Sequence, residues 1–296
     1  MEMALVVNPA SGKRRGEAIG LEAANLLNAA GISVRTLQGV SAKDTVRLVD
    51  EAIAQGIDAL IVVGGDGLVH LVAQRIAGTA IVMGIVPAGT GNDTARALGV
   101  PRANTRDAVD IVVAGLVRPM DLAHADGTYV STVVASGFDS RVNERANAMR
   151  WPRGRMRYNL AMVAELGVFR PLAFHLVLDG KPLDVEAMLV AVGNAPSFGG
   201  GLRICEGAVI DDGLLDVVII GPVSKARLVR VFPKLYKGTH ITEPSYQRHR
   251  VTSVTLDSRG VVAYGDGERL GPLPRTVTVA PGALRVFVPA SLDPSA

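Results

Sequence analysis

The chain has 296 residues, of which 48% are hydrophobic and 20% charged, a net charge of +3 and one cysteine. These values exclude a disordered chain and a disulfide framework, and no apolar run approaches the roughly 20 residues that a membrane-spanning helix requires. The length predicts two domains, or one large domain with an insertion, and the slight positive charge suits acidic ligands or an anionic membrane surface, with no nucleic-acid partner expected.

Up to about residue 120, short apolar runs alternate with helical patterns. The first run, residues 4–7, soon turns polar and is interpreted as a β-strand and not as a signal peptide, so we expect a cytoplasmic protein. Strand-like runs recur at 32–38, 58–67 and 80–89, and helical patterns lie at 16–31, 42–56 and 92–99. This alternation is typical of a parallel sheet covered by helices, an α/β domain.

From about residue 127 the hydrophobic period changes to two, which favours antiparallel strands in a sandwich or barrel. The expected strands lie at 128–137, 174–183, 186–195, 213–221, 249–258, 261–270 and 275–289. Asp179-Gly180 and Asp266-Gly267 suit tight hairpin turns. Two basic, helix-like segments, 141–167 and 224–238, interrupt the strands.

Glycine-rich turns follow three strands of the first half. GGDG occupies 64–67, PAGTGND occupies 87–93 and NPASGK occupies 8–13. The second turn lacks the third glycine of the dinucleotide fingerprint, and no phosphate-binding P-loop pattern is present. Glycines after a strand let backbone N–H groups approach an anion, and a following helix N-terminus favours negative charge. Ordinary strand-to-helix turns are the alternative; the three together indicate a polyphosphate site.

The turns and four later motifs carry a family resemblance. In chain order they read NPASG, GGDG, PAGTGND, SGFD, VGNAPSFGGG, GAVIDDGLLDV and YGDGE. This ordered set resembles the diacylglycerol kinase catalytic family of bacterial lipid kinases, within the NAD kinase-like superfamily. The resemblance implies an α/β nucleotide-binding domain over 1–122, completed by 285–296, and a β-sandwich lipid-substrate domain over 123–284.

The resemblance also implies ATP- and Mg²⁺-dependent phosphorylation of a lipid hydroxyl. It gives the nucleotide-binding residues as Asn8, Pro9, Ala10, Ser11, Gly12, Thr36, Gly64, Gly65, Asp66, Gly67, Leu68, Thr90, Gly91 and Asn92. Asp93 would join a metal–water network, and the catalytic base would be Asp266, Glu268 or Asp66. An ordinary hairpin turn is the alternative for Asp266.

Two further features qualify the assignment. By resemblance a structural Mg²⁺ would bind Asp212 and the carbonyls of Val209 and Leu214, where the alternative is a plain turn. The family usually has Thr, Asn and Glu where this chain has Leu68, His70 and Leu71, which removes a hydroxyl and a carboxylate. For His70 a surface or capping role is favoured over a catalytic one. Cys205 is interpreted as a small buried hydrophobe.

The basic segments are either solvated faces or membrane contacts. One holds Arg150, Arg153, Arg155 and Arg157 around Trp151, and the other holds Lys225, Arg227, Arg230, Lys234 and Lys237 among apolar residues. A kinase with a bilayer substrate needs such contacts, so we expect a peripheral protein at the inner membrane face. The alternatives are a NAD kinase-like small-molecule kinase and a catalytically silent nucleotide- or lipid-binding relative. The oligomeric state is left open, a homodimer included.

Overall fold

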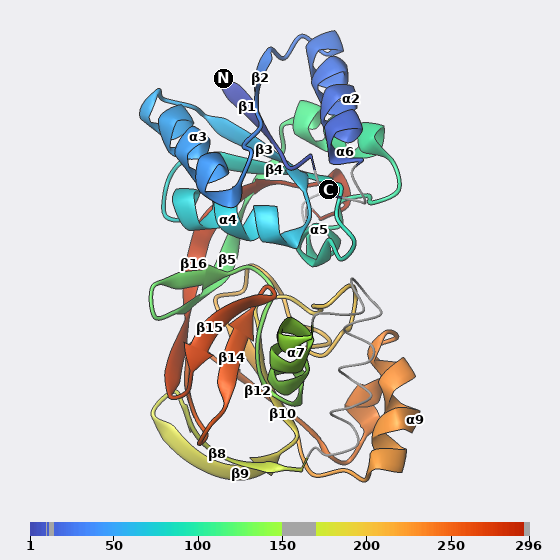
Figure 1. Cartoon of the computed structure of the whole chain (residues 1–296), viewed down its shortest axis with the longest axis vertical. Helices are drawn as coiled ribbons and strands as arrows, with labels where there is room; N and C mark the ends of the chain where they lie inside the picture. The colour runs from blue at the N-terminus through green and yellow to red at the C-terminus, as the bar shows by residue number, and fades with distance from the viewer. Residues whose placement is uncertain (10, 12–14, 150–169, 293–296) are drawn as a thin grey trace.

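The computed structural model describes residues 1–9, 11, 15–149 and 170–292. Its first half is a parallel sheet with helices on both faces (Figure 1). The elements are β1 (Met3–Val7), α2 (Gly16–Ala29), β2 (Val34–Leu37), α3 (Ala42–Ala54), β3 (Ala59–Gly64), α4 (Asp66–Ile76), β4 (Val82–Pro87), α5 (Asp93–Ala97) and α6 (Thr105–Ala114). Every residue of β1 and β3 is buried, as expected for strands covered on both faces.

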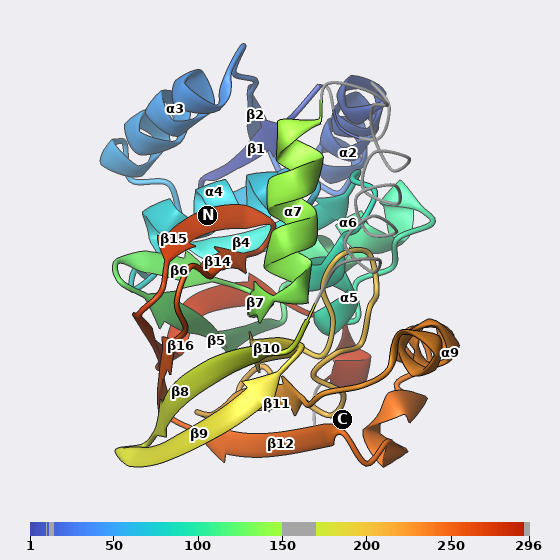
Figure 2. The same ribbon diagram turned by 60° about the horizontal axis from the view of Figure 1, so that its bottom comes forward.

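The second half is a β-sandwich. Its elements are β5 (Val117–Ala125), β6 (Thr128–Val130), β7 (Val133–Gly137), α7 (Phe138–Ala148), β8 (Leu172–Leu178), β9 (Lys181–Ala187), β10 (Leu189–Gly193), β11 (Leu215–Ile220), α9 (Lys225–Leu235), η1 (Thr239–Thr242), β12 (Tyr246–Val251), β13 (Ser253–Asp257), β14 (Val262–Gly265), β15 (Glu268–Pro272), β16 (Arg275–Phe287) and η2 (Ala290–Leu292). One layer is the antiparallel sheet β12-β11-β10-β7-β14-β15, and the other contains β16-β13-β8-β9. In Figure 2, β8 and β9 of one layer and β12 of the other lie below the parallel sheet. The predicted fold class, α/β followed by an antiparallel β-sandwich, is confirmed.

A single long strand, β16, joins the two halves. Its first residues pair with β13 of the sandwich, and Arg285 and Val286 pair in parallel with Val82 and Met83 of β4. The parallel sheet and one layer of the sandwich are therefore one continuous sheet of ten strands. The buried apolar residues still form separate cores, which divide within β5 between Leu122 and Ala123.

Three predicted strands are wrong, because each is divided between the two sheets. Residues 128–137 form β6 and β7, residues 186–195 form the end of β9 and β10, and residues 249–258 form the end of β12 and all of β13. In the last of these, β12 belongs to one layer of the sandwich and β13 to the other. The break is at Thr252, whose amide N–H donates to Asp179 Oδ1 at 3.0 Å and whose Oγ1 donates to the same atom at 2.8 Å. Period-two alternation continues through the corner, so the sequence pattern contains no sign of it.

Both predicted hairpin turns are present. Asp179 and Gly180 have φ of 46° and 81°, and Asp266 and Gly267 have φ of 51° and 86°. Positive φ at both central residues defines the type I′ turn, whose twist matches that of the strands it joins. Cys205 is fully buried, as predicted, and burial raises the pKa of its thiol. In the described part of the chain, no helix is long and apolar enough to cross a membrane.

Candidate active site

The two glycine turns of the parallel sheet touch each other. They follow β3 and β4, which are hydrogen-bonded neighbours with Gly64 opposite Pro87. A Cβ on Gly89 would lie 2.4 Å from the Cα of Gly65, so neither turn has room for a side chain at this contact. The carboxyl ends of adjacent parallel strands thus form a single crevice lined by backbone, which is where α/β proteins bind ligands.

Asn92 closes the second turn. Its backbone is left-handed, with φ of 52°, and its side chain brackets Gly89. Asn92 Oδ1 accepts from the Gly89 amide and Nδ2 donates to the Gly89 carbonyl, both at 3.0 Å. Because these side-chain atoms are occupied within the turn, Asn92 shapes the crevice, whereas Thr90 beside it is exposed.

Asp66 begins α4 and caps α5. Its Oδ1 accepts from the amides of Asp93 and Thr94, at 2.7 and 3.2 Å. Burial, followed by the charge of Asp93, raises the pKa of Asp66, although these two hydrogen bonds oppose the shift. Asp66 Oδ2 accepts no hydrogen bond from the described residues, and a Cβ on Gly91 would lie 2.6 Å from it. The crevice therefore contains a carboxylate oxygen available to a cation or a water.

Asp93 ties the crevice to the sandwich half. It is 3% exposed, and its Oδ2 accepts from the Gly200 amide at 2.6 Å. Its Oδ1 accepts from the Ser197 hydroxyl at 3.1 Å. The loop 196–201, which contains the triple glycine, thereby forms one wall of the site.

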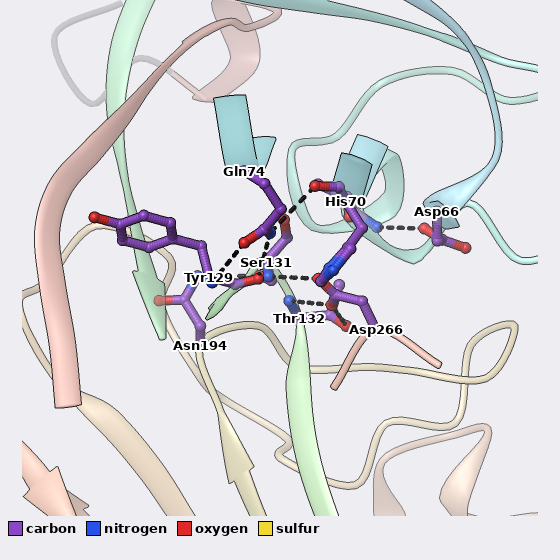
Figure 3. A network of polar contacts seen from close by, with 9 residues as sticks. Asp66, His70, Gln74, Tyr129, Ser131, Thr132, Asn194 and Asp266 are labelled. Atoms are coloured by element: carbon purple, nitrogen blue, oxygen red, sulfur yellow. Dashed lines mark hydrogen bonds and ion pairs between the residues drawn. The ribbon is translucent and has the colours of Figure 1, made fainter. Parts of the chain in front are cut away.

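Asp266 is the centre of a second contact between the halves (Figure 3). Its Oδ1 accepts from the Thr132 amide at 2.9 Å and the Thr132 hydroxyl at 2.6 Å. Its Oδ2 accepts from the Ser131 amide at 2.8 Å and lies 3.1 Å from His70 Nδ1. Asp266 therefore occupies a hairpin turn and also accepts several hydrogen bonds through its side chain.

The predicted surface position of His70 is wrong. The side chain is 12% exposed and lies between α4 and the β14–β15 turn, against Asp266. Gln74, one helical turn later, makes two bonds to the backbone of Tyr129, at 2.7 and 2.9 Å. The face of α4 that begins with Asp66 thus docks onto the second half of the chain (Figure 3).

The other predicted site residues differ in their surroundings. Leu68 is buried, and its side chain packs under Gly64, so it contributes to the core and could meet a nucleotide only through its backbone. Glu268 is exposed on β15, and its side chain forms no hydrogen bond or ion pair with the described residues. Thr36 is exposed on β2 beside Leu5. Asn8 and Ser11 form a turn at the end of β1, joined by a bond from the Ser11 amide to the Asn8 carbonyl, and Pro9 lies within it. Ala10 and Gly12 lie outside the described residues.

Comparison with known proteins identifies the family. Residues 2–125 match the diacylglycerol kinase catalytic domain, and residues 132–288 match the YegS C-terminal NAD kinase beta sandwich-like domain. A diacylglycerol kinase of Mycobacterium tuberculosis is 42% identical over 96% of this chain and 94% of its own. The chain belongs to the diacylglycerol kinase family of lipid kinases. The resemblance carried by the ordered motifs is confirmed.

Less similar diacylglycerol kinases also match this chain over nearly its whole length. One from Bacillus subtilis is 28% identical over 91% of this chain and 90% of its own. A crystal structure of a diacylglycerol kinase from Bacillus anthracis has a TM-score of 0.79 at 24% identity and covers 99% of this chain and 98% of that one. The latter likeness shows that the two-part fold is that of known diacylglycerol kinase structures.

The crevice of this family member suits a magnesium ion shared with a ligand. Its ligands are oxygens, including Asp66 Oδ2, which fits a hard cation. Among the described residues, no group of three or more His, Cys, Asp or Glu side chains could hold a metal by itself. Mg²⁺ typically takes one or two carboxylates and completes its shell with substrate phosphates and water. The residues present fit such an ion only together with a phosphorylated ligand.

The second predicted metal site, at Val209, Asp212 and Leu214, lies among carboxylates that are already paired. Each of its three acidic residues is paired with an arginine: Asp211 with Arg118, Asp212 with Arg250, and Asp216 with Arg248. Asp212 Oδ1 also accepts from the Leu214 amide at 3.0 Å, while Val209 is 46% exposed. A cation at Asp212 would therefore compete with Arg250, and this metal site stays a prediction.

A thermal-unfolding comparison tests that site. If Mg²⁺ binds at Asp212, adding it should raise the melting temperature of the wild type and of Arg250→Gln, but not that of Asp212→Ala. The physical reason is that a ligand bound only to the native state stabilises it by mass action. Equal stabilisation of all three proteins would exclude Asp212 as the ligand.

Several contact residues of the site were missed by sequence reasoning. Asn194 Nδ2 donates to the carbonyls of Asp121 and Ser131, at 2.7 and 3.0 Å. Asp121 itself accepts from the amides of Gly213 and Gly282, both at 2.7 Å. Asn194 lies in the motif VGNAPSFGGG, so the sequence could have indicated it as a site residue. No motif indicates Asp121, because its partners are distant in sequence.

Proposed function

We propose that this protein is an ATP-dependent lipid kinase that transfers the γ-phosphate to a hydroxyl of diacylglycerol or a related lipid. The observation that carries the proposal is the crevice where the glycine turns after β3 and β4 meet, with Asp66 and Asp93 beside them, in a chain of the diacylglycerol kinase family. Backbone amides and helix N-termini bind phosphate groups, and carboxylates bind the accompanying cation.

The proposal divides the crevice between nucleotide and metal. Gly64, Gly65, Gly67 and Gly91 would border the phosphates, because glycines in these turns let backbone N–H groups approach an anion closely. A Cβ would meet no atom within 4 Å at Gly67 and would lie 2.6 Å from Asp66 Oδ2 at Gly91. The turn at Asn8 to Ser11, Thr36 and Thr90 would line the rest of the nucleotide. Bound Mg²⁺ would neutralise phosphate charge, and Asp66 and Asp93 are the residues that would hold it.

An apolar cavity supports a lipid as the acceptor. It measures about 220 Å³ and lies between α9 and the antiparallel sheet. Its lining includes Phe138, Met188, Phe198, Leu228, Phe232 and Tyr246. Phe198 belongs to the same loop as Ser197 and Gly200, which bind Asp93. An acyl chain in the cavity would therefore lie next to the wall of the nucleotide crevice.

A panel of acceptors tests the proposal. With ATP and Mg²⁺, labelled phosphate should enter diacylglycerol or another lipid in mixed vesicles, and no label should enter NAD. Label in NAD alone would favour the NAD kinase-like alternative. ATP binding without any transfer would indicate a silent relative.

The outer face of α9 is proposed as the membrane contact. Lys234 and Arg227 turn inward to Glu243, at 2.7 and 2.8 Å, and their side-chain hydrogen bonds lower the pKa of that carboxyl. Arg230 on α9 and Lys237 just after its end are exposed and form no ion pair with the described residues. Val229, next to Arg230, is 61% exposed and also lines the apolar cavity. This mixture of cationic and apolar groups suits peripheral binding to an anionic bilayer. The arginines around Trp151 lie outside the described residues.

We predict that Arg230→Glu with Lys237→Glu weakens binding to anionic vesicles by about 30-fold or more, since each basic residue near such a surface contributes about 1 kcal/mol. The effect should shrink at high salt, because charges are screened over about 8 Å at physiological ionic strength. Co-sedimentation measures it. Lys43→Glu with Arg102→Glu, an equal charge change on exposed residues of the first half, is the control. Equal loss in both double variants would show a net-charge effect and no docking face.

A further inference from the structure

The loop 196–201 lies between the nucleotide crevice and the apolar cavity and has contacts with both. Its second half is three glycines, Gly199, Gly200 and Gly201, with φ of 60°, 88° and 104°. Glycine loses more conformational freedom than any other residue when its backbone is fixed. The loop therefore needs contacts with its surroundings to hold a single conformation.

The crevice side of the loop holds the Asp93 carboxylate. The Gly200 amide donates to Asp93 Oδ2 at 2.6 Å, and the Ser197 hydroxyl donates to Oδ1 at 3.1 Å. Ser197 and Asp93 are only 2% and 3% exposed, so water competes little for these bonds. A Cβ on Gly91 would lie 3.6 Å from the Gly200 nitrogen. The loop thus packs directly on the turn that we assign to the nucleotide.

Arg96 adds a further contact between the loop and this turn. Its Nη2 donates to the Gly91 carbonyl at 3.3 Å, and its Nε lies 3.5 Å from Asp93 Oδ1. A Cβ on Gly201 would lie 3.1 Å from Arg96 Cζ, so the guanidinium packs on the last of the three glycines. Loop and turn therefore form one packed unit around Asp93.

The residues that flank the three glycines form part of the cavity wall. Phe198 and Leu202 both line the apolar cavity between α9 and the antiparallel sheet. They are also bonded to each other, because the Phe198 amide donates to the Leu202 carbonyl at 3.1 Å and the Leu202 amide donates to the Phe198 carbonyl at 2.9 Å. A lipid chain that packs on this pair would restrict the same glycines that contact Asp93.

We propose that Ser197 and Gly200 are positioning residues for Asp93, and that their loop couples the two sites. A lipid chain in the cavity and Mg²⁺ with nucleotide in the crevice then bind with positive cooperativity. This inference rests on the proposed lipid kinase function, in which Asp93 is one of the two carboxylates that hold the cation. Whichever ligand binds first bears the cost of ordering the loop, and the second ligand meets a loop that is already ordered.

Calorimetric titration of the wild type tests the coupling. A non-hydrolysable ATP analogue with Mg²⁺ is titrated with and without saturating short-chain diacylglycerol, and the diacylglycerol is titrated with and without the analogue. Each ligand should tighten the binding of the other by about 5-fold or more, and by the same factor, because coupling between two ligands is reciprocal. Neither measurement depends on turnover.

Ser197→Ala tests the role of the loop in that coupling. The variant loses one of the two hydrogen bonds from the loop to Asp93, so both factors should fall toward one. Ser136→Ala is the matched control, because it also removes a buried serine hydroxyl, which donates to the Val190 carbonyl at 3.1 Å within the antiparallel sheet. Its factors should equal those of the wild type.

Hydrogen exchange of the Gly200 amide tests the proposal in the wild type alone, whether or not the variants fold. Without nucleotide, the short-chain diacylglycerol should slow this exchange, because a filled cavity holds the Gly200 amide on Asp93. The Gly213 amide is the control: it also donates to a buried carboxylate, that of Asp121 at 2.7 Å, but lies outside the loop, so its exchange should not change.

Three outcomes would overturn the proposal: both ligands bind the wild type without affecting each other, Ser197→Ala keeps the wild-type factors, or diacylglycerol leaves exchange at Gly200 unchanged. A wild type that binds the ATP analogue but neither binds nor phosphorylates diacylglycerol or any other lipid would remove the proposed function, and this inference with it.

Discussion

Asp66→Asn is expected to abolish phosphoryl transfer and to leave the folded protein at least as stable as the wild type. Asn keeps the Oδ1 acceptor for the amides of Asp93 and Thr94 and removes the buried charge. The charge is needed to hold the cation that accompanies the nucleotide. Removing such an interaction from the transition state should lower turnover by about 10²-fold or more.

Because the pKa of Asp66 is raised, the stability difference between the wild type and Asp66→Asn should depend on pH. An acid with a higher pKa in the folded state binds its proton more tightly there, so its ionisation destabilises the fold. As the pH rises from the ordinary value of 3.8 through the raised pKa, the wild type should lose stability relative to Asp66→Asn. Calorimetry of both proteins from pH 4 to pH 7 measures the difference. A melting temperature of the variant that is lower at every pH would contradict the account.

Asp266→Asn is expected to lower both stability and turnover. Asn tolerates the left-handed backbone, so the turn itself is retained. Its amide group cannot accept from both Ser131 and His70, and one buried donor without a partner costs about 1–3 kcal/mol. Turnover should fall roughly 10²-fold or more if Asp266 is the catalytic base, because Asn cannot accept the proton.

Two other variants sharpen this test. Asp126 occupies another Asp-Gly turn, with φ of 46°, and its carboxylate pairs with Arg275 away from the crevice. Asp126→Asn controls for the chemical change in the same type of turn. Glu268→Gln separates the candidate bases. Glu268 is exposed and forms no ion pair within the described part of the chain, so its change should barely affect the melting temperature. If Glu268→Gln loses turnover and Asp266→Asn keeps it, the base is Glu268.

The sequence predicts the fold correctly wherever residues close together in the chain determine the structure. The buried runs of β1 and β3 and the Asp-Gly hairpins are local features, and all were predicted. The corner at Thr252 was missed, because the interaction that makes it comes from Asp179, 73 residues earlier. Similarly, β16 reads as an ordinary strand, and only its pairing with both β4 and β13 shows that it joins the two halves.

The sequence predicts part of the candidate site for the same reason. Adjacent parallel strands end at one edge, so the meeting of the turns at Gly65 and Gly89 follows from the βαβ pattern. The contact between His70 and Asp266 joins residues 196 positions apart, and no spacing rule connects them. The arginine partner of Asp212 is likewise 38 positions away. The surroundings of His70 and Asp212 thus depend on charged partners that are distant in sequence, and the motifs do not predict those partners.

The central claim is that the crevice at Asp66 transfers phosphate from ATP to a lipid. Transfer of labelled γ-phosphate from ATP to diacylglycerol in anionic vesicles, measured for the wild type beside Asp66→Asn, tests it most directly. We predict labelled phosphatidic acid from the wild type and at most about one hundredth of that rate from the variant. Equal transfer by both proteins, or no transfer to any lipid by the wild type, would contradict it.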